Sequence, residues 1–265
     1  MNVYSIFGFI LASIVLVIGL KLSTDDLTMF WDIPSVFIVF GGTFAAAAIC
    51  FQLNRLFMLF KIFFRRMIFG KKNVFTAVIN EVMLVADCYR KGEAIKSIRE
   101  KISDPFLKEA LQIMEDGVIG KDEIIPIMQK RNDNITFHYM EEANKIKTIG
   151  KFPPAFGMIG TTIGMIVLLG NLGGEDAMKK MGPAMGVCLI TTLYGSVVAN
   201  FLFIPVSENL IEETKSIYMK NKMIIEGVAL VMDKANPILM VEKLNSYANP
   251  TDRVDWRTIV NKKIA

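Results

Sequence analysis

Long apolar windows dominate the hydropathy pattern of this chain. Four of them, at residues 3–20, 33–51, 152–172 and 182–206, are long and uncharged. Windows of about 18 or more apolar residues are typical of membrane-spanning helices. A cleaved leader is the alternative for the first window, but it lacks a basic n-region and its apolar run exceeds the roughly 7–15 residues of a leader core. We therefore expect four retained spans.

The two polar regions, 52–151 and 207–265, carry helical rather than alternating periodicity. A helix is predicted over residues 75–89. Another is predicted to begin at Asp104-Pro105, with the aspartate as N-cap, and to end at Gly117. The predicted fold class is thus all-α: an integral membrane protein with four transmembrane helices and a helical cytoplasmic domain. The expected order is two helices with a short outer loop (1–51, loop 21–32), a cytoplasmic domain (52–151), two further helices (152–206) and a cytoplasmic tail (207–265).

Charge around the spans predicts their orientation. The loop 21–32 holds one cation against three acids, whereas a cationic cluster follows the second span: Arg55, Lys61, Arg65, Arg66, Lys71 and Lys72. Cytoplasmic flanks are enriched in Lys and Arg. Both termini and the bulk of the chain are therefore expected in the cytoplasm, with both short loops outside.

Composition excludes several classes of function. The net charge of +4 is too small to indicate nucleic-acid binding. The three cysteines (Cys50, Cys88 and Cys188) are scattered without metal-ligand spacing and are interpreted as small buried apolar residues, and His138 is the single histidine. Since no nucleophile–base pair or metal cluster is recognisable, we expect neither an enzyme nor a cofactor.

The last two spans differ from the first two because they are rich in glycine and hydroxyl residues, among them Thr161, Thr191 and Thr192. Small residues allow close helix packing, and a threonine hydroxyl often bonds its own helix. Neither span contains an Asp, Glu, Lys, Arg or His. Ion carriage through hydrocarbon normally needs one, so an ion path here would require a carboxylate from another polypeptide.

Prolines frame these spans. Pro153-Pro154 is predicted to open the third span and Pro183 the fourth, positions where the missing N–H costs little. Pro205 is compatible with two interpretations: an end of the fourth helix, or a hinge at its cytoplasmic mouth.

Several segments resemble the MotA/PomA family of flagellar motor stator A-subunits, which is related to the MotA/TolQ/ExbB proton-channel superfamily. They are the stretch from Pro154 to Thr161 with Gly164-Met-Ile, the stretch from Gly182-Pro to Gly195 with Ala199-Asn and Pro205, and Asp32-Ile-Pro34-Ser with Gly41-Gly42. The resemblance covers nearly the whole chain, including the four-span layout.

The resemblance implies a stator subunit of the bacterial inner membrane. Five copies would form a ring around a dimer of B-subunits, each of which supplies an essential membrane aspartate. Thr161, Thr191 and Thr192 match hydroxyls near the ion in sodium-type members, which favours transported sodium over protons. Pro154 and Pro205 match the prolines that couple ion binding to cytoplasmic movement.

The resemblance also implies contact with a rotor switch-complex protein. Arg90-Lys91-Gly92 resembles the family's basic rotor-contacting pair, and Glu100 is the candidate acidic companion, although family members usually carry glutamates two turns after the pair. An ExbB/TolQ-like energiser of outer-membrane processes is the alternative, disfavoured by the short 21–32 loop between two N-terminal spans. A structural membrane scaffold is a third reading, which leaves the threonine pattern unexplained.

Overall fold

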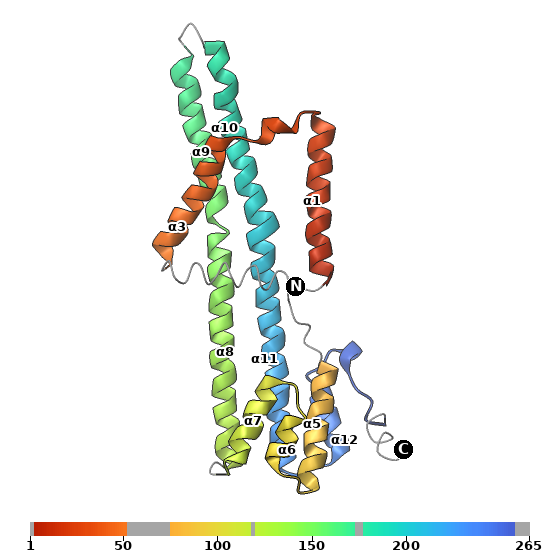
Figure 1. Cartoon of the computed structure of the whole chain (residues 1–265). Coiled ribbons are helices and arrows are strands. Elements are labelled where there is room, and N and C mark those ends of the chain that lie inside the picture. Colours follow the sequence, from red (N-terminus) through yellow and green to blue (C-terminus); the bar gives the residue numbers. More distant parts are fainter. Residues whose placement is uncertain (1–2, 52–74, 118–119, 173–176, 258–265) are drawn as a thin grey trace. The chain divides into compact units, whose positions relative to one another are not determined.

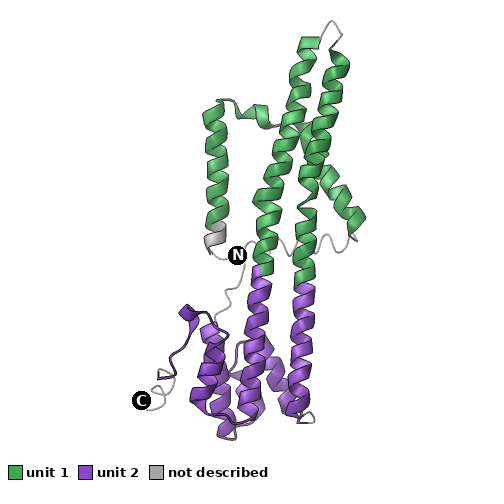
Figure 2. Ribbon diagram, turned by 180° about the vertical axis from the view of Figure 1, so that it is seen from behind, with its two compact units in different colours: residues 1–71, 140–211 green, residues 72–139, 212–265 purple. Residues whose placement is uncertain are grey.

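A computed structural model describes residues 3–51, 75–117, 120–172 and 177–257, and every regular element in these ranges is helical. The all-α prediction is therefore confirmed. The cationic cluster 55–72 lies outside the described residues. The chain divides into two compact units, one formed by residues 1–71 with 140–211 and the other by residues 72–139 with 212–265 (Figure 2).

The first unit contains the apolar helices. They are α1 (Val3–Ser23), η1 (Leu27–Phe30), α2 (Ile33–Val36), the π-helical turn η2 (Phe37–Gly41), α3 (Gly42–Cys50), α9 (Phe152–Asn171), α10 (Ala177–Val197) and the π-helical segment η3 (Val198–Phe203). The helices α9 and α10 run side by side as a hairpin (Figure 1). Two longer helices, α8 (Lys121–Ile149) and α11 (Ile204–Met232), contribute residues to both units.

Three helical stretches among the described residues are long and apolar enough to cross a membrane: Leu27–Cys50, Lys121–Asn171 and Ala177–Met232. The first predicted span lies in α1, whose 21 residues would reach about 31 Å at 1.5 Å per residue. That length is compatible with a fourth crossing. Large apolar side chains such as Phe7 (66% exposed) and Ile166 (65%) face outward, as in a protein surrounded by lipid.

The second predicted span contacts the third where Gly42 makes room for the aromatic ring of Phe156. The Asp32 side chain accepts a hydrogen bond from the Ser35 amide and caps α2 (2.8 Å), and Pro34 occupies the first turn. After the π-helical turn η2, a Cβ on Gly42 would lie 2.2 Å from the Phe156 ring of α9. Glycine is therefore required where the second span meets the third.

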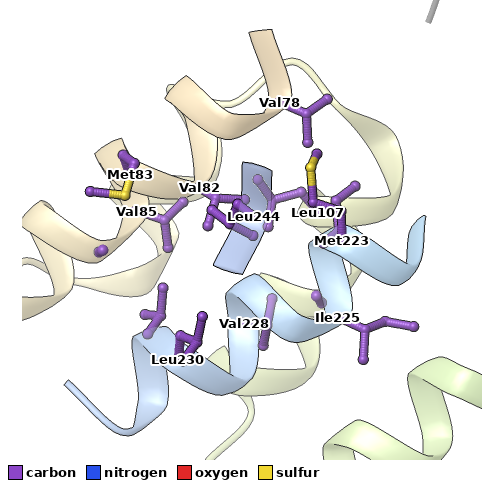
Figure 3. Packing of buried hydrophobic residues seen from close by; sticks show 14 of the residues in the cluster. Val78, Val82, Met83, Val85, Leu107, Met223, Ile225, Val228, Leu230 and Leu244 are labelled. Carbon is purple, nitrogen blue, oxygen red and sulfur yellow. The ribbon is translucent and has the colours of Figure 1, made fainter. Parts of the chain in front are cut away.

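The second unit is built from α5 (Phe75–Arg90), α6 (Ile95–Glu100), α7 (Pro105–Glu115), α12 (Pro237–Asn245) and the short η4 (Pro250–Asp252), with parts of α8 and α11. Its core joins apolar side chains of α5, α7, α11 and α12 (Figure 3). Leu107, Met223 and Leu244 are each fully buried, which stabilises the unit by roughly 1.5–3 kcal/mol per side chain.

The local signals in this region are confirmed. Asp104 accepts hydrogen bonds from the Phe106 and Leu107 amides and so caps α7, and Pro105 follows at its first turn. Gly117 has φ +64°, the left-handed conformation in which a helix commonly ends. The bounds of α7 therefore follow from capping signals in the sequence.

Candidate functional site: an oxygen cluster on the α9–α10 hairpin

Glycines bring α9 and α10 into close contact. A Cβ on Gly157 would lie 2.9 Å from the Thr191 carbonyl oxygen, one on Gly164 2.6 Å from Cys188 Sγ, and one on Gly195 2.5 Å from the Pro153 carbonyl oxygen. Two helices approach this closely only where one of them lacks side chains. The hairpin is thus a rigid platform on which neighbouring polar groups are held in fixed positions.

Two of the three predicted threonines meet on this platform. Thr161 Oγ1 lies 2.6 Å from Thr192 Oγ1, 2.9 Å from the Cys188 carbonyl oxygen and 3.0 Å from the Gly157 carbonyl oxygen. The Thr192 hydroxyl is 3.3 Å from the Cys188 carbonyl oxygen. Two hydroxyl protons serve this set of oxygens, so lone pairs remain for a ligand outside the hairpin.

Thr191 is placed differently from its neighbour. It is fully buried, and its hydroxyl donates to the Val187 carbonyl oxygen (2.7 Å) and lies 3.2 Å from the Cys188 carbonyl oxygen. A Cβ on Gly160 would lie 2.4 Å from its methyl group. Thr191 therefore packs inside the α9–α10 interface, whereas Thr192 is exposed beside the half-buried Thr161.

Cys188 is the residue that sequence reasoning did not connect with the cluster. It is buried, as predicted for all three cysteines and as found for Cys88, whereas Cys50 is exposed. Three threonine hydroxyl oxygens lie within 3.3 Å of the Cys188 carbonyl oxygen, and the Cys188 thiol donates to the Thr161 carbonyl oxygen (3.3 Å). The spacing of three and four residues to Thr191 and Thr192 is the pattern of hydroxyl back-bonding within a helix. This spacing is the signal in the sequence that could have connected Cys188 with the threonines.

The charge content of the hairpin is as informative as its oxygens. No Asp, Glu, Lys, Arg or His occurs between Lys151 and Glu175 or between Lys180 and Glu208. The cluster therefore presents neutral hydroxyl and carbonyl oxygens, which are hard ligands suited to hard cations. It carries no group that could neutralise an ion or exchange a proton near neutral pH.

The prolines lie at distinct points of the hairpin. Pro153 and Pro154 occupy the first turn of α9, as predicted, where Gly195 of α10 packs against them. Pro183 lies inside α10, which begins at Ala177, so the prediction that it opens the fourth helix is wrong. Lys179 and Lys180, which precede the apolar window 182–206, belong to the first turns of the helix.

Pro205 does not end the fourth helix. The chain passes from α10 through the π-helical segment η3 into α11, and the Ile204 amide donates to the Ala199 carbonyl oxygen, five residues earlier. A π-turn inserts one residue and accommodates a proline that lacks an N–H. The interpretation of Pro205 as a helix terminus is therefore wrong; its role as a hinge stays a prediction.

The basic pair Arg90-Lys91 lies in the second unit at the end of α5. The Arg90 guanidinium donates to the Ala235 carbonyl oxygen and lies 3.8 Å from Asp87, whereas Lys91 is exposed. Glu100 is exposed at the end of α6. No contact described for this unit brings Glu100 to Arg90 or Lys91.

Besides Asp87, Glu93 is an acid near this basic end. Lys101 donates to it at 2.8 Å, and this hydrogen bond holds the pKa of the Glu93 carboxyl below its usual range. The same contact raises the pKa of Lys101. Burial, reinforced by a hydrogen bond to Glu93, raises the pKa of the Cys88 thiol, which supports a structural rather than reactive cysteine.

Replacing Arg90 with alanine is expected to destabilise the second unit by about 1–2 kcal/mol, because the Ala235 carbonyl oxygen loses a charged donor. Thermal unfolding of the purified protein in detergent measures the change. Lys91→Ala is the matched control, since Lys91 is exposed beside Arg90. Equal melting temperatures for the Arg90→Ala variant and the unmodified protein would show that the contact contributes nothing.

The fold and the hairpin define a helical membrane protein with an uncharged oxygen cluster. Residues 98–223 match the model of the MotA/TolQ/ExbB proton channel family. The chain is 34% identical over 265 residues to motility protein A of Borreliella burgdorferi, covering 96% of each chain. It is 28% identical to chemotaxis protein PomA of Vibrio alginolyticus over 93% of each. The chain therefore belongs to the MotA/PomA family of flagellar stator A-subunits.

A solved structure agrees in fold. The flagellar MotAB stator complex from Bacillus subtilis contains a chain that matches this one with a TM-score of 0.83 at 24% identity, covering 94% of this chain and 98% of that one. The full-length relatives named above are motility and chemotaxis proteins, which favours the stator reading over an ExbB/TolQ-like energiser.

Proposed function

We propose that this chain is the A-subunit of a sodium-driven stator, which works in the bacterial inner membrane with a one-span B-subunit and turns ion flow into torque on a rotor. The observation that carries the proposal is the Thr161–Thr192 hydroxyl pair, 2.6 Å apart, in a part of the hairpin that contains no Asp, Glu, Lys, Arg or His. The MotAB complex that shares this fold supports the B-subunit as partner.

The chemistry follows from what each polypeptide supplies. A cation in hydrocarbon needs a counter-charge, and the B-subunit aspartate would provide it. The threonine hydroxyls and the Cys188 carbonyl oxygen would then replace part of the hydration shell of a sodium ion, since neutral oxygens are good ligands for hard cations. Protons need no such shell, which is why the hydroxyl pair favours sodium.

The remaining roles follow the expected topology. Both termini and the second unit lie in the cytoplasm, and both short loops lie outside. The apolar surfaces of the first unit face lipid and neighbouring copies in a ring of five. Pro154 at the start of α9 and Pro205 after the π-helical segment are the bends through which occupancy of the oxygen cluster alters α10 and α11.

Rotor contact involves the exposed side chains of the second unit. Lys91 and Glu100 are both exposed, and Arg90 holds the end of α5 against the Ala235 carbonyl oxygen. In this division of labour Arg90 positions the surface, Lys91 offers a cation to the rotor protein, and Glu100 offers an anion.

The test is the swimming speed of a stator-deficient strain that expresses this chain with its B-subunit. At fixed pH, speed is expected to rise with external sodium and to saturate, and a B-subunit with asparagine in place of its membrane aspartate should not support swimming. If the swimming speed varied with pH but did not change with sodium, protons rather than sodium would be the coupling ion. Absence of swimming although both subunits reach the membrane would contradict the stator function itself.

A further inference from the structure

The side chains on the exposed face of α10 change from apolar to polar at Thr192. Toward the start of α10 this face carries Met185 (50% exposed) and Leu189 (67%). In the other direction it carries the exposed polar residues Thr192 and Ser196 and continues to the exposed Asn200 of η3. Residues four apart return to nearly the same side of a helix. A polar stripe therefore starts at the threonine pair and runs toward α11, while the opposite half of the same face is apolar.

The polar groups of this stripe are not satisfied by the hairpin. Asn200 Nδ2 donates to the Ser196 carbonyl oxygen (2.9 Å). Within the part of the chain that the structure describes, Asn200 Oδ1 accepts no hydrogen bond and Ser196 Oγ takes part in none. Serine hydroxyls in apolar helices ordinarily bond back to a carbonyl three or four residues earlier. Ser196 thus keeps its hydroxyl available on the exposed face.

A main-chain oxygen is left open at the same place. In an α-turn the Asn200 carbonyl oxygen would accept from the Ile204 amide, but that amide donates to Ala199 instead. In a π-turn the donor would be residue 205, which is proline and has no N–H. Asn200 therefore contributes two oxygens without a helical donor, one from its side chain and one from its main chain.

We propose that Ser196 and Asn200 form a second station for the transported cation, between the Thr161–Thr192 pair and the start of α11. This inference rests on the proposed function and extends it: the ion leaves the hydroxyl pair along Ser196 Oγ and the two Asn200 oxygens. The ligand is a small monovalent cation held by neutral oxygens: sodium under the proposed function, with hydronium as the alternative that the test separates. The apolar residues Met185 and Leu189 confine this polar route to one half of α10.

The test uses the complete A–B complex in the stator-deficient strain. For Asn200→Leu, the sodium concentration that gives half-maximal speed at fixed pH is expected to rise about twofold to tenfold, the effect of losing one oxygen contact. A parallel series in pH at fixed sodium tests hydronium in the same way. Asn171→Leu is the matched control: Asn171 Nδ2 also donates to a carbonyl four residues earlier, that of Val167 (2.6 Å), but at the far end of α9.

Ser196→Ala is the milder second variant, because it removes a single hydroxyl. It tests the second station if the Asn200→Leu variant does not accumulate in the membrane. A rise in the half-saturating concentration for Ser196→Ala, with the Asn171→Leu control unchanged, supports the station. A lower maximal speed without any shift in that concentration, in both the sodium and the pH series, would overturn it and leave Asn200 a structural residue. Since the unmodified complex is measured alongside, failure of the station is distinguishable from failure of the stator function.

Discussion

Gly195→Val is expected to abolish motility and to remove most folded subunit from the membrane. A Cβ at this position would lie 2.5 Å from the Pro153 carbonyl oxygen, 3.0 Å from its carbonyl carbon and 3.1 Å from Pro154 Cα. All three are backbone atoms that cannot rotate away. We expect a cost of at least about 3 kcal/mol, the upper end of the range for overpacking.

Gly186→Val in the same helix is the matched control, because the nearest atom to its added Cβ would be the Ile190 side-chain terminus at 4.0 Å. Membrane abundance by immunoblot and thermal unfolding of the purified complex measure both variants. Equal abundance of the two valine variants would mean that α9 and α10 can separate at no cost, and the rigid platform would have to be abandoned.

Thr161→Val is expected to raise the sodium concentration for half-maximal swimming speed about tenfold or more, at unchanged membrane abundance. Valine keeps the shape of threonine but removes the oxygen that lies within 3.0 Å of Thr192 Oγ1 and of the Cys188 and Gly157 carbonyl oxygens. A tenfold shift corresponds to about 1.4 kcal/mol, the size of a single good oxygen contact.

Thr162→Val controls for the change of residue type. Thr162 is exposed, and its hydroxyl donates to the Met158 carbonyl oxygen of its own helix (3.0 Å). Sodium dependence measured for both variants at fixed pH separates them. If Thr162→Val shifted the curve as far as Thr161→Val, the effect would belong to helix α9 in general and not to the hydroxyl pair.

Much of the fold could be predicted because its signals are local. Apolar length predicted the spans, and the aspartate, proline and glycine at 104, 105 and 117 predicted the bounds of α7. The start of α10 was not predicted because the apolar window begins only at residue 182, whereas the helix carries Lys179 and Lys180 in its first turns and Pro183 in its interior. Pro205 was ambiguous because only the π-turn at Val198–Phe203 decides whether the helix continues.

The residue types of the candidate site could be predicted from the sequence, but the directions in which the threonine side chains point could not. Consecutive residues on a helix differ by about 100°, so Thr191 and Thr192 must face different ways. Which of them faces Thr161 depends on where α9 lies, and the close fit of Gly160 to Thr191 determines this. Likewise, the hydrogen bond from Arg90 to Ala235 joins residues far apart in the sequence, so no periodic pattern of residues could predict it.

The absence of charged side chains around the oxygen cluster also bears on the order of biosynthesis. An A-subunit inserted before its partner would offer an arriving cation only neutral oxygens, with nothing to compensate the charge in the bilayer. Surplus copies would therefore not dissipate the membrane potential. Under the proposed function, a cell could accumulate copies of this chain without loss of the ion gradient, and conduction would begin only when the B-subunit is in place.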